Sequence, residues 1–435
     1  MTNCSQGAWT PQSWAMKPVM AQAVEYDDPK ALEQVIRTIS TLPALVNPMK
    51  IEIARNNFAA AARGKAFIIQ GGDCAESFDD VRLHVIQQKI KLLQEQSHLL
   101  AQGLGLPIVT VGRIAGQYAK PRSSPWDTLE DGSKTHAFRG HSVNGPSLSE
   151  RRPDPYRLLL GDFYSRTTLE MIKDIQSTPT VTGPGWLPTP SSLPLTPEET
   201  DVAPLETPTG TIFTSHEAIH LPYESAMTRD SYNTSASFIW IGERTRQLDG
   251  AHVEYIRGLR NPIGVKIGPT TDSSTLVALL DTICPEPHLP ENLGRVTIIT
   301  RLGVDQVATV LPPLIRAVQK AGHTPVWMCD PCHGNTQITA TGLKTRHVGR
   351  MLLEATRTYQ IHRENQSLMG GLHLEQTGEY VSECIDDMST NAENSLSLNY
   401  RSLCDPRLSN AQALTLVRQF VDFVRRWEDK RNLGL

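Results

Sequence analysis

The chain has 435 residues, with 42 lysines and arginines against 46 aspartates and glutamates. This near balance, without a basic or acidic block, argues against binding to nucleic acid or to a membrane surface through bulk charge. No apolar run approaches the ~18 residues of a transmembrane helix. The N-terminal stretch lacks the basic and apolar regions of a signal peptide, so we expect a cytoplasmic protein.

Residues 1–60 precede the first predicted strand, and we expect them to form a partly helical N-terminal extension that packs outside the main domain or against another subunit. Residues 61–435 are expected to form one catalytic domain. It contains eight short apolar, β-branched runs, each bounded by Gly, Pro or polar residues. The runs cover residues 66–72, 107–114, 211–218, 236–243, 262–269, 295–303, 324–331 and 371–378. Such runs are typical of buried parallel strands.

Apolar residues recur at helical spacing between these runs. Three examples are the stripe of Ile86, Ile90, Leu93 and Leu100, that of Val307, Leu311, Leu314 and Val318, and that of Leu416, Phe420, Phe423 and Trp427. Strands alternating with helices predict an α/β fold, a (β/α)8 TIM barrel with an N-terminal extension and long inserted loops. A doubly wound open sheet is the alternative. The long connection 177–210 holds eight prolines and is expected to be irregular.

Charged or coordinating side chains stand near the end of each predicted strand. They are Cys74, Arg113, His216, Glu217, Glu243, Arg244, Lys266, Arg301, His333 and Glu375. In TIM barrels the active site is built at the carboxyl ends of the strands. One group is cationic: Arg113, Lys120, Arg122, Arg244, Lys266 and Arg301. These side chains suit a phosphorylated or carboxylated substrate, because Arg binds phosphate in a bidentate fashion and Lys supplies a point charge.

A second group could bind a metal: Cys74, His333, Glu375 and Asp405. Thiolate, imidazole and carboxylate ligands together suit a borderline divalent ion such as Mn, Co, Zn or Fe. His333 also ends a C-x-x-C-H pattern with Cys329 and Cys332, which is typical of covalent haem attachment. That attachment normally follows export, and no second C-x-x-C completes a zinc module. An odd count of seven cysteines fits free or metal-binding thiols better than a disulfide framework.

Eight motifs together resemble the type II (plant-like) family of 3-deoxy-D-arabino-heptulosonate 7-phosphate (DAHP) synthases. In chain order they are QGGDCAESF, RIAGQYAKPRS, WIGERTRQLDGAH, GVKIGP, CDPCHGNT, KTRH, GGLHLEQTGE and CDPRL. The resemblance implies condensation of phosphoenolpyruvate with erythrose 4-phosphate, which gives DAHP and phosphate and is the first step of the shikimate pathway. It also implies a divalent metal cofactor such as Mn or Co, and a homo-oligomer, most simply a dimer that involves the N-terminal extension. Whether a chorismate mutase binds this chain as a partner stays open.

The resemblance also assigns roles to residues. The metal ligands would be Cys74, His333, Glu375 and Asp405. The substrate-binding residues would be Arg113, Lys120, Arg122, Ser123, Glu243, Arg244, Lys266 and Arg301. The catalytic residues would be Lys120, Glu217, Glu243 and Lys266. Glu217, or a water held by the metal, is expected to manage proton transfer, with His216 as a weaker candidate. Cys404 is expected to lie near Cys74, so that oxidation of a metal-free enzyme would join the two.

Two departures from the family pattern affect the expected specificity. The stretch FRGHSVNG carries His141 where the family has an acid, which leaves open an aminated erythrose 4-phosphate (an aminoDAHP synthase) or another aldose phosphate as substrate. The segment 177–210 is shorter than the extra helices of regulated members. We therefore expect the site for aromatic amino acids to be absent or altered, as in members that serve secondary metabolism. A barrel without catalysis that acts as a regulatory partner is the alternative from another functional class.

Overall fold

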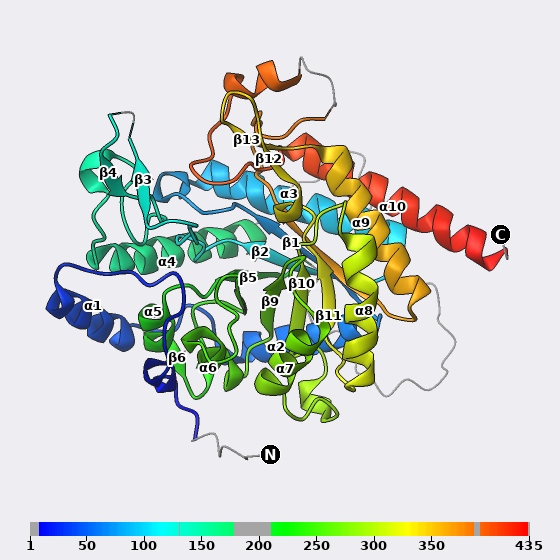
Figure 1. Cartoon of the computed structure of the whole chain (residues 1–435), viewed down its shortest axis with the longest axis horizontal. Coiled ribbons are helices and arrows are strands. Elements are labelled where there is room, and N and C mark those ends of the chain that lie inside the picture. Colours follow the sequence, from blue (N-terminus) through cyan, green and yellow to red (C-terminus); the bar gives the residue numbers. More distant parts are fainter. Residues whose placement is uncertain (1–7, 130, 178–209, 387–391, 434–435) are drawn as a thin grey trace.

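The structure is a computed structural model that describes residues 8–129, 131–177, 210–386 and 392–433 (Figure 1). Its centre is a closed barrel of parallel strands, in the order β1-β14-β11-β10-β9-β8-β5-β2. These strands are β1 (Phe67–Gly72), β2 (Ile108–Arg113), β5 (Ile212–Glu217), β8 (Phe238–Ile241), β9 (Ile263–Ile267), β10 (Val296–Thr300), β11 (Val326–Cys329) and β14 (Met369–Glu375). Because β1 pairs with both β2 and β14, the sheet is closed. The TIM barrel prediction is confirmed, and the open-sheet alternative is wrong.

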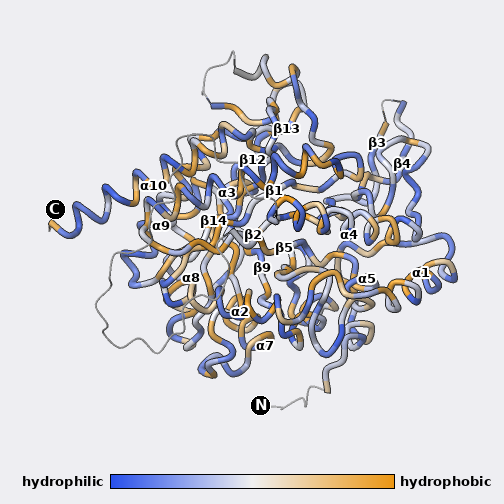
Figure 2. Tube along the Cα trace, turned by 180° about the vertical axis from the view of Figure 1, so that it is seen from behind, coloured by the Kyte–Doolittle hydropathy of each residue, from blue (hydrophilic) through white to orange (hydrophobic). Residues whose placement is uncertain are grey.

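Each predicted run contains or overlaps one barrel strand. The last run is displaced, because β14 begins at Met369 and ends at Glu375, before the predicted end at residue 378. A helix follows each strand and packs on the outside of the barrel. These helices are α3 (Leu83–Leu104), α4 (Tyr156–Ser177), α5 (Leu221–Ala226), α6 (Ala251–Arg257), α7 (Ser273–Ile283), α8 (Val307–Lys320), α9 (Val348–Glu364) and α10 (Asn410–Asn432). The free end of α10 projects from the body and is mainly hydrophilic (Figure 2).

Two helices precede the barrel, α1 (Pro29–Thr41) and α2 (Pro48–Ala62). Side chains of Asp28 and Asn47 accept backbone N–H groups at their first turns, and a proline follows each cap. Helix α2 buries Ala54, Phe58 and Ala61 in one cluster with side chains of the barrel strands, so it closes the amino end of the barrel. The predicted boundary at residue 60 lies inside α2, and the division into an extension and a catalytic barrel stays a prediction.

Short strands and 3-10 turns lie in the loops between the main helices and strands. The two-residue to three-residue strands form hairpins: β3 (Trp126–Thr128) with β4 (Lys134–His136), β6 (Thr228–Arg229) with β7 (Tyr232–Asn233), and β12 (Thr336–Ile338) with β13 (Lys344–Arg346). The 3-10 turns are Ser13–Met16, Phe78–Asp80, Leu148–Glu150, Pro290–Asn292, His333–Asn335 and Ala392–Leu398. None of the helices in the described ranges is long and apolar enough to cross a membrane. The prediction about amino-acid feedback falls on residues 178–209, which lie outside the described residues.

Candidate active site

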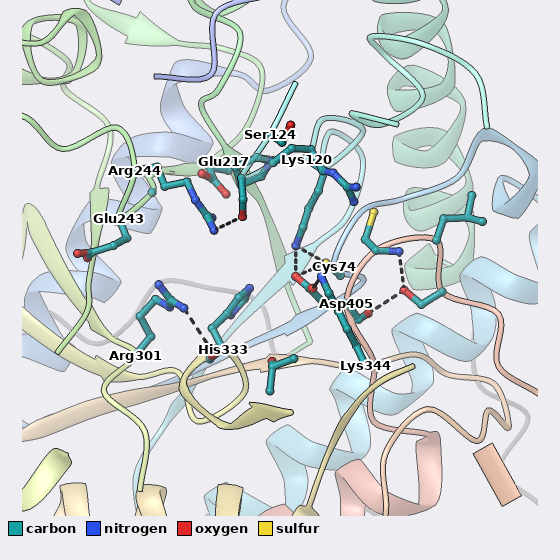
Figure 3. Close-up of a pocket in the computed structure, with 18 of the residues that line it drawn as sticks. Cys74, Lys120, Ser124, Glu217, Glu243, Arg244, Arg301, His333, Lys344 and Asp405 are labelled. Atoms are coloured by element: carbon teal, nitrogen blue, oxygen red, sulfur yellow. Dashed lines mark hydrogen bonds and ion pairs between the residues drawn. The ribbon is translucent and has the colours of Figure 1, made fainter. Parts of the chain in front are cut away.

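A cavity of about 550 Å³ opens at the carboxyl ends of the barrel strands (Figure 3). Of the site residues predicted from the sequence, all except Glu375 and the weaker candidate His216 line it. They are Cys74, Arg113, Lys120, Arg122, Ser123, Glu217, Glu243, Arg244, Lys266, Arg301, His333 and Asp405. Glu375 is fully buried and contacts Arg113 and His333 from this set. The structure therefore brings together residues that are as far apart in the chain as Cys74 and Asp405, 331 positions, because a closed barrel gathers all its strand ends at one mouth.

Three side chains form a group with the spacing of a metal site. The Sγ atom of Cys74 and one carboxylate oxygen from each of Glu375 and Asp405 all lie within 4.8 Å of one another. The Nε2 atom of His333 lies 3.1 Å from Oε1 of Glu375. The four side chains that the sequence proposed as ligands thus meet in one place, on four different segments of the chain.

The chemistry of this donor set fits a divalent ion. Oε1 of Glu375 is buried and makes no hydrogen bond, although nitrogens of Arg113 and His333 lie 3.2 and 3.1 Å away. This oxygen has no hydrogen-bond donor of its own, so it is available as a ligand atom beside the Arg113 charge. Thiolate, imidazole and carboxylate together match an ion of intermediate softness.

Lys120 lies against the same group. Its Nζ atom donates to Sγ of Cys74 and to Oδ2 of Asp405, the latter at 2.6 Å. Burial lowers the pKa of Lys120, but Cys74 and Asp405 outweigh this effect, and the pKa stands well above its usual range. Burial raises the pKa of the Cys74 thiol well above its usual range. A metal that binds Cys74 as a thiolate must therefore displace a proton.

Two cations of the cavity share one buried histidine. Nζ of Lys266 and Nη1 of Arg113 both donate to Nε2 of His373, at 3.1 and 2.7 Å. Nδ1 of His373 donates to Oε1 of Gln70 at 2.6 Å. Burial holds the pKa of His373 well below its usual range, so the imidazole is neutral. It can then accept from both cations without adding a third positive charge.

Asp330 bonds both to Lys266 of the cationic group and to His333 of the predicted metal ligands. Its Oδ2 atom accepts from Nζ of Lys266 at 2.9 Å and from Nδ1 of His333 at 2.7 Å. Burial would raise the pKa of Asp330, but His333 and Lys266 hold it well below its usual range. A carboxylate on one ring nitrogen of a histidine orients the other nitrogen toward a metal. Here that other nitrogen is the one that faces Glu375.

The remaining polar residues line the cavity wall. The Glu243 carboxylate accepts from Nη2 of Arg246 at 2.7 Å, a partner that the sequence prediction did not name. Arg244 donates from Nη2 to Oγ of Ser123 at 3.1 Å. This bond joins the loop after β8 to Lys120–Ser123, a segment that carries three of the predicted substrate-binding residues and is called the clamp below.

His216 and Glu217 end the same strand but lie in different places. Glu217 lines the cavity. The His216 side chain is buried and its Nε2 atom lies 2.9 Å from Oε1 of Glu224, on α5. Successive side chains of a strand point to opposite faces, so only one of the two can face the barrel mouth. The weaker prediction, a catalytic His216, is therefore wrong, and this histidine packs the strand against α5.

His141, the departure from the family motif, does not reach the cavity. Its Nε2 atom lies 3.3 Å from Oγ of Ser77, and its ring meets the edges of Phe78 and Phe138. It lines a separate cavity of about 210 Å³. Burial lowers its pKa, which keeps the ring neutral near pH 7. The loop that carries His141 lies next to Lys120, because the Arg139 carbonyl accepts the Lys120 N–H at 2.8 Å, but the His141 side chain faces the other cavity.

Comparison with known proteins agrees with this geometry. Residues 9–182 and 198–421 match the profile of the class-II DAHP synthetase family. The chain belongs to this family. It is 42% identical to a phospho-2-dehydro-3-deoxyheptonate aldolase of Neurospora crassa over 96% of this chain and 94% of that protein. The enzyme of Streptomyces coelicolor is 38% identical over 93% of this chain and 95% of its own, and AroG of Mycolicibacterium smegmatis is 37% identical over 92% and 91%.

Within this class-II chain, the C-x-x-C-H pattern has a structural explanation. The Sγ atom of Cys329 donates to Oγ1 of Thr358 on α9, whereas Sγ of Cys332 accepts the backbone N–H of Glu375. The two sulfurs thus serve different contacts, and the haem interpretation is wrong for this family member. Cys74 and Cys404 are both free thiols, both line the cavity and each affects the pKa of the other, which confirms the expected proximity. A disulfide between them stays a prediction.

Sequence reasoning missed one buried arginine that supports the site. Arg346 lies in the quoted motif KTRH, yet nothing in its spacing pointed to Glu375. Its Nη2 atom donates to Oε2 of Glu375 at 2.7 Å, and Nη1 donates to the carbonyl of Pro406, next to Asp405. Both charged side chains are fully buried. Burial would raise the pKa of Glu375, but His333 and Arg346 hold it well below its usual range.

Proposed function

We propose that this chain condenses phosphoenolpyruvate with erythrose 4-phosphate to give DAHP and inorganic phosphate, the first step of the shikimate pathway. The observation that carries the proposal is the cavity of about 550 Å³ whose cationic wall lies beside the Cys74, Glu375 and Asp405 group. Both substrates are anions, and one carries an aldehyde. Full-length relatives that are phospho-2-dehydro-3-deoxyheptonate aldolases support the same reaction.

Phosphoenolpyruvate carries a carboxylate and a phosphate, so its site needs several cations. We assign it to Arg113, Arg244, Lys266 and Arg301. His373 and Asp330 hold the buried Arg113 and Lys266 in place before substrate arrives. Holding two reaction partners in the correct orientation can lower the activation free energy by about 7–11 kcal/mol. Fixed cations also favour the departure of phosphate, because they stabilise the charge that develops on it.

The aldose phosphate needs a separate clamp, which we assign to Lys120, Arg122 and Ser123. Arg122 is partly exposed and pairs with Asp127 at 3.0 Å, so its guanidinium can exchange this partner for a phosphate. Ser123 is tied to Arg244, so the two anion sites share a wall. This arrangement brings C3 of phosphoenolpyruvate toward the aldehyde carbon, where the new bond forms.

Cys74, His333, Glu375 and Asp405 would hold a divalent ion such as Mn or Co, which when bound supplies a Lewis acid for the aldehyde oxygen. Glu217 is placed on the cavity wall to move a proton as water adds at C2 and phosphate leaves through C–O cleavage. Glu243, oriented by Arg246, lies beside Arg244 and is a second carboxylate for that step.

A coupled phosphate-release assay tests the proposal. Phosphoenolpyruvate is supplied with erythrose 4-phosphate, with its aminated analogue, or with other aldose phosphates. We expect release with erythrose 4-phosphate, its loss in a strong chelator and its recovery with Mn or Co. Preference for the aminated aldose would favour an aminoDAHP synthase, and no release with any aldose would favour the non-catalytic barrel. Full activity in chelator would remove the metal from the mechanism.

We also propose a homodimer, and a chorismate mutase partner stays a prediction. Exposed apolar side chains on α4 offer a surface for a second copy: Tyr156, Leu160 and Phe163 are 52%, 45% and 60% exposed. Sedimentation of the purified chain measures the oligomeric state, and a monomer at assay concentration would contradict the dimer.

A further inference from the structure

The segment before α1 forms an N-terminal arm, residues 8–28, that runs along the outside of the barrel (Figure 1). Its beginning is anchored on α6: Nε1 of Trp9 donates to the carbonyl of Glu254 at 3.1 Å, and the carbonyl of Pro18 accepts from the backbone of Ala251 at 2.9 Å. Its end is anchored by Tyr26, whose hydroxyl lies 2.8 Å from Nε2 of His220. The stretch between these anchors reaches the active site.

Gln22 makes two hydrogen bonds to the backbone of Arg122, a residue of the clamp. Its Nε2 atom donates to the Arg122 carbonyl at 2.9 Å, and its Oε1 atom accepts the Arg122 N–H at 2.8 Å. Two bonds from one planar amide fix both the position and the orientation of the peptide they hold, as a neighbouring strand would. The arm thereby supports the clamp from a point 100 positions earlier in the chain.

The backbone of Gln22 is held as firmly as its side chain. Nη2 and Nη1 of Arg139 donate to the carbonyls of Gln22 and Ala23, both at 2.6 Å. The carbonyl of Arg139 in turn accepts the backbone N–H of Lys120 at 2.8 Å. Asn144 accepts the Arg139 N–H at 2.9 Å. The arm, this arginine loop and the clamp therefore form one hydrogen-bonded unit.

Gln22 has a φ angle of 66°, in the left-handed region that side chains rarely adopt. Such a conformation costs free energy and persists only where the surrounding contacts require it, and it is frequent at functional sites. At this position the contacts that require it are the two bonds to Arg122 and the two from Arg139. A glycine would relieve the backbone cost and lose the amide.

We propose that Gln22 is a positioning residue for the aldose phosphate, acting through the backbone of Arg122. The inference rests on the proposed function, since it assumes that Arg122 and Ser123 bind the phosphate of the aldose. It gives the N-terminal extension a direct part in the active site. Phosphoenolpyruvate should be affected less, because Lys266 and Arg113, two of its four assigned cations, are held by Asp330 and His373 and not by the arm.

Two variants separate the amide from the backbone conformation. Gln22→Ala removes the amide and keeps the strained φ angle, whereas Gln22→Gly removes both. We expect each to raise KM for erythrose 4-phosphate about tenfold, the effect of losing two hydrogen bonds of ordinary strength. KM for phosphoenolpyruvate should stay within about twofold. Gln22→Gly should melt no lower than Gln22→Ala, because glycine tolerates this φ angle. Met16→Ala, in the same arm and 87% exposed, is the control.

Equal changes in both KM values, or no change in either, would overturn the inference. Calorimetric titration of erythrose 4-phosphate alone provides a second measure, in which both variants should bind about tenfold more weakly than the wild type. This titration separates the two proposals: a wild-type chain that binds the aldose phosphate but releases no phosphate would refute the proposed function, and the comparison of the variants would still decide the role of Gln22.

Discussion

Replacing Arg346 by methionine tests how the site holds its buried charges. Arg346 and Glu375 are both fully buried, and Nη2 of the arginine lies 2.7 Å from Oε2 of the carboxylate. Methionine keeps the unbranched apolar stem of arginine but is shorter and uncharged, so Arg346→Met leaves Glu375 without this partner. The carbonyl of Pro406 and Oγ1 of Thr336 lose a donor in the same change.

The magnitude follows from burial. Removing one partner of a buried ion pair costs about 3–5 kcal/mol. The unfolding entropy of a protein is about 2.1 cal/mol/K per residue, which for 435 residues is roughly 0.9 kcal/mol/K. We therefore expect the melting temperature to fall by roughly 3–6 °C. Loss of a group that orients a metal ligand typically lowers metal affinity about 10–100-fold. Scanning calorimetry and titration with Mn²⁺ in the absence of substrate measure the two effects.

Arg37→Met is the matched control, because Arg37 also pairs with a glutamate, Glu33 at 2.7 Å, but both side chains are more than 70% exposed. Exposed pairs contribute about 0–1 kcal/mol, so this variant should melt close to the wild type and bind Mn²⁺ equally well. If Arg346→Met behaved like Arg37→Met in both measurements, the buried pair would not support the site, and the reasoning would fail.

Three further predictions concern the histidines and Glu217. Glu217→Gln should lower kcat about 100-fold with little change in KM. His216→Gln should lower the melting temperature and leave kcat close to the wild-type value. Equal losses of kcat in the two variants would contradict the separation of their roles. His141→Asp should leave KM for erythrose 4-phosphate within about threefold, because His141 lines the other cavity; steady-state kinetics with a tenfold change would contradict this. Burial lowers the pKa of His362 from 6.5 to about 3. Between these two pH values the unfolded chain binds a proton on His362 and the folded chain does not. The folded state therefore loses stability as the pH falls from about 6.5 to about 3. The loss attributable to His362 is at most roughly 4–5 kcal/mol, and acid unfolding of His362→Leu should shift to lower pH; an unchanged midpoint would refute the assignment.

The barrel and the ring of polar residues at its mouth were readable from the sequence. Eight buried, β-branched runs alternate with helical stripes. This pattern is typical of parallel strands, because such strands are buried on both faces of the sheet. Residues such as Arg113 and Glu217 end their strands, and the closed topology puts all those ends together. The metal-type residues lack any local spacing, so their grouping came from whole motifs that resemble one family. Side-chain alternation along the strand could also have separated His216 from Glu217.

The supporting contacts were decided by the tertiary structure alone. Arg346 reaches Glu375 across 29 positions, and Gln22 reaches Arg122 across 100, with no periodicity that relates either pair. His141 occupies a motif next to the clamp, yet its side chain turns to another cavity. The physical reason is that hydrophobic patterning is a local, repetitive property of a chain, whereas the partner of a buried polar group depends on which segments the finished fold places within hydrogen-bond distance of it.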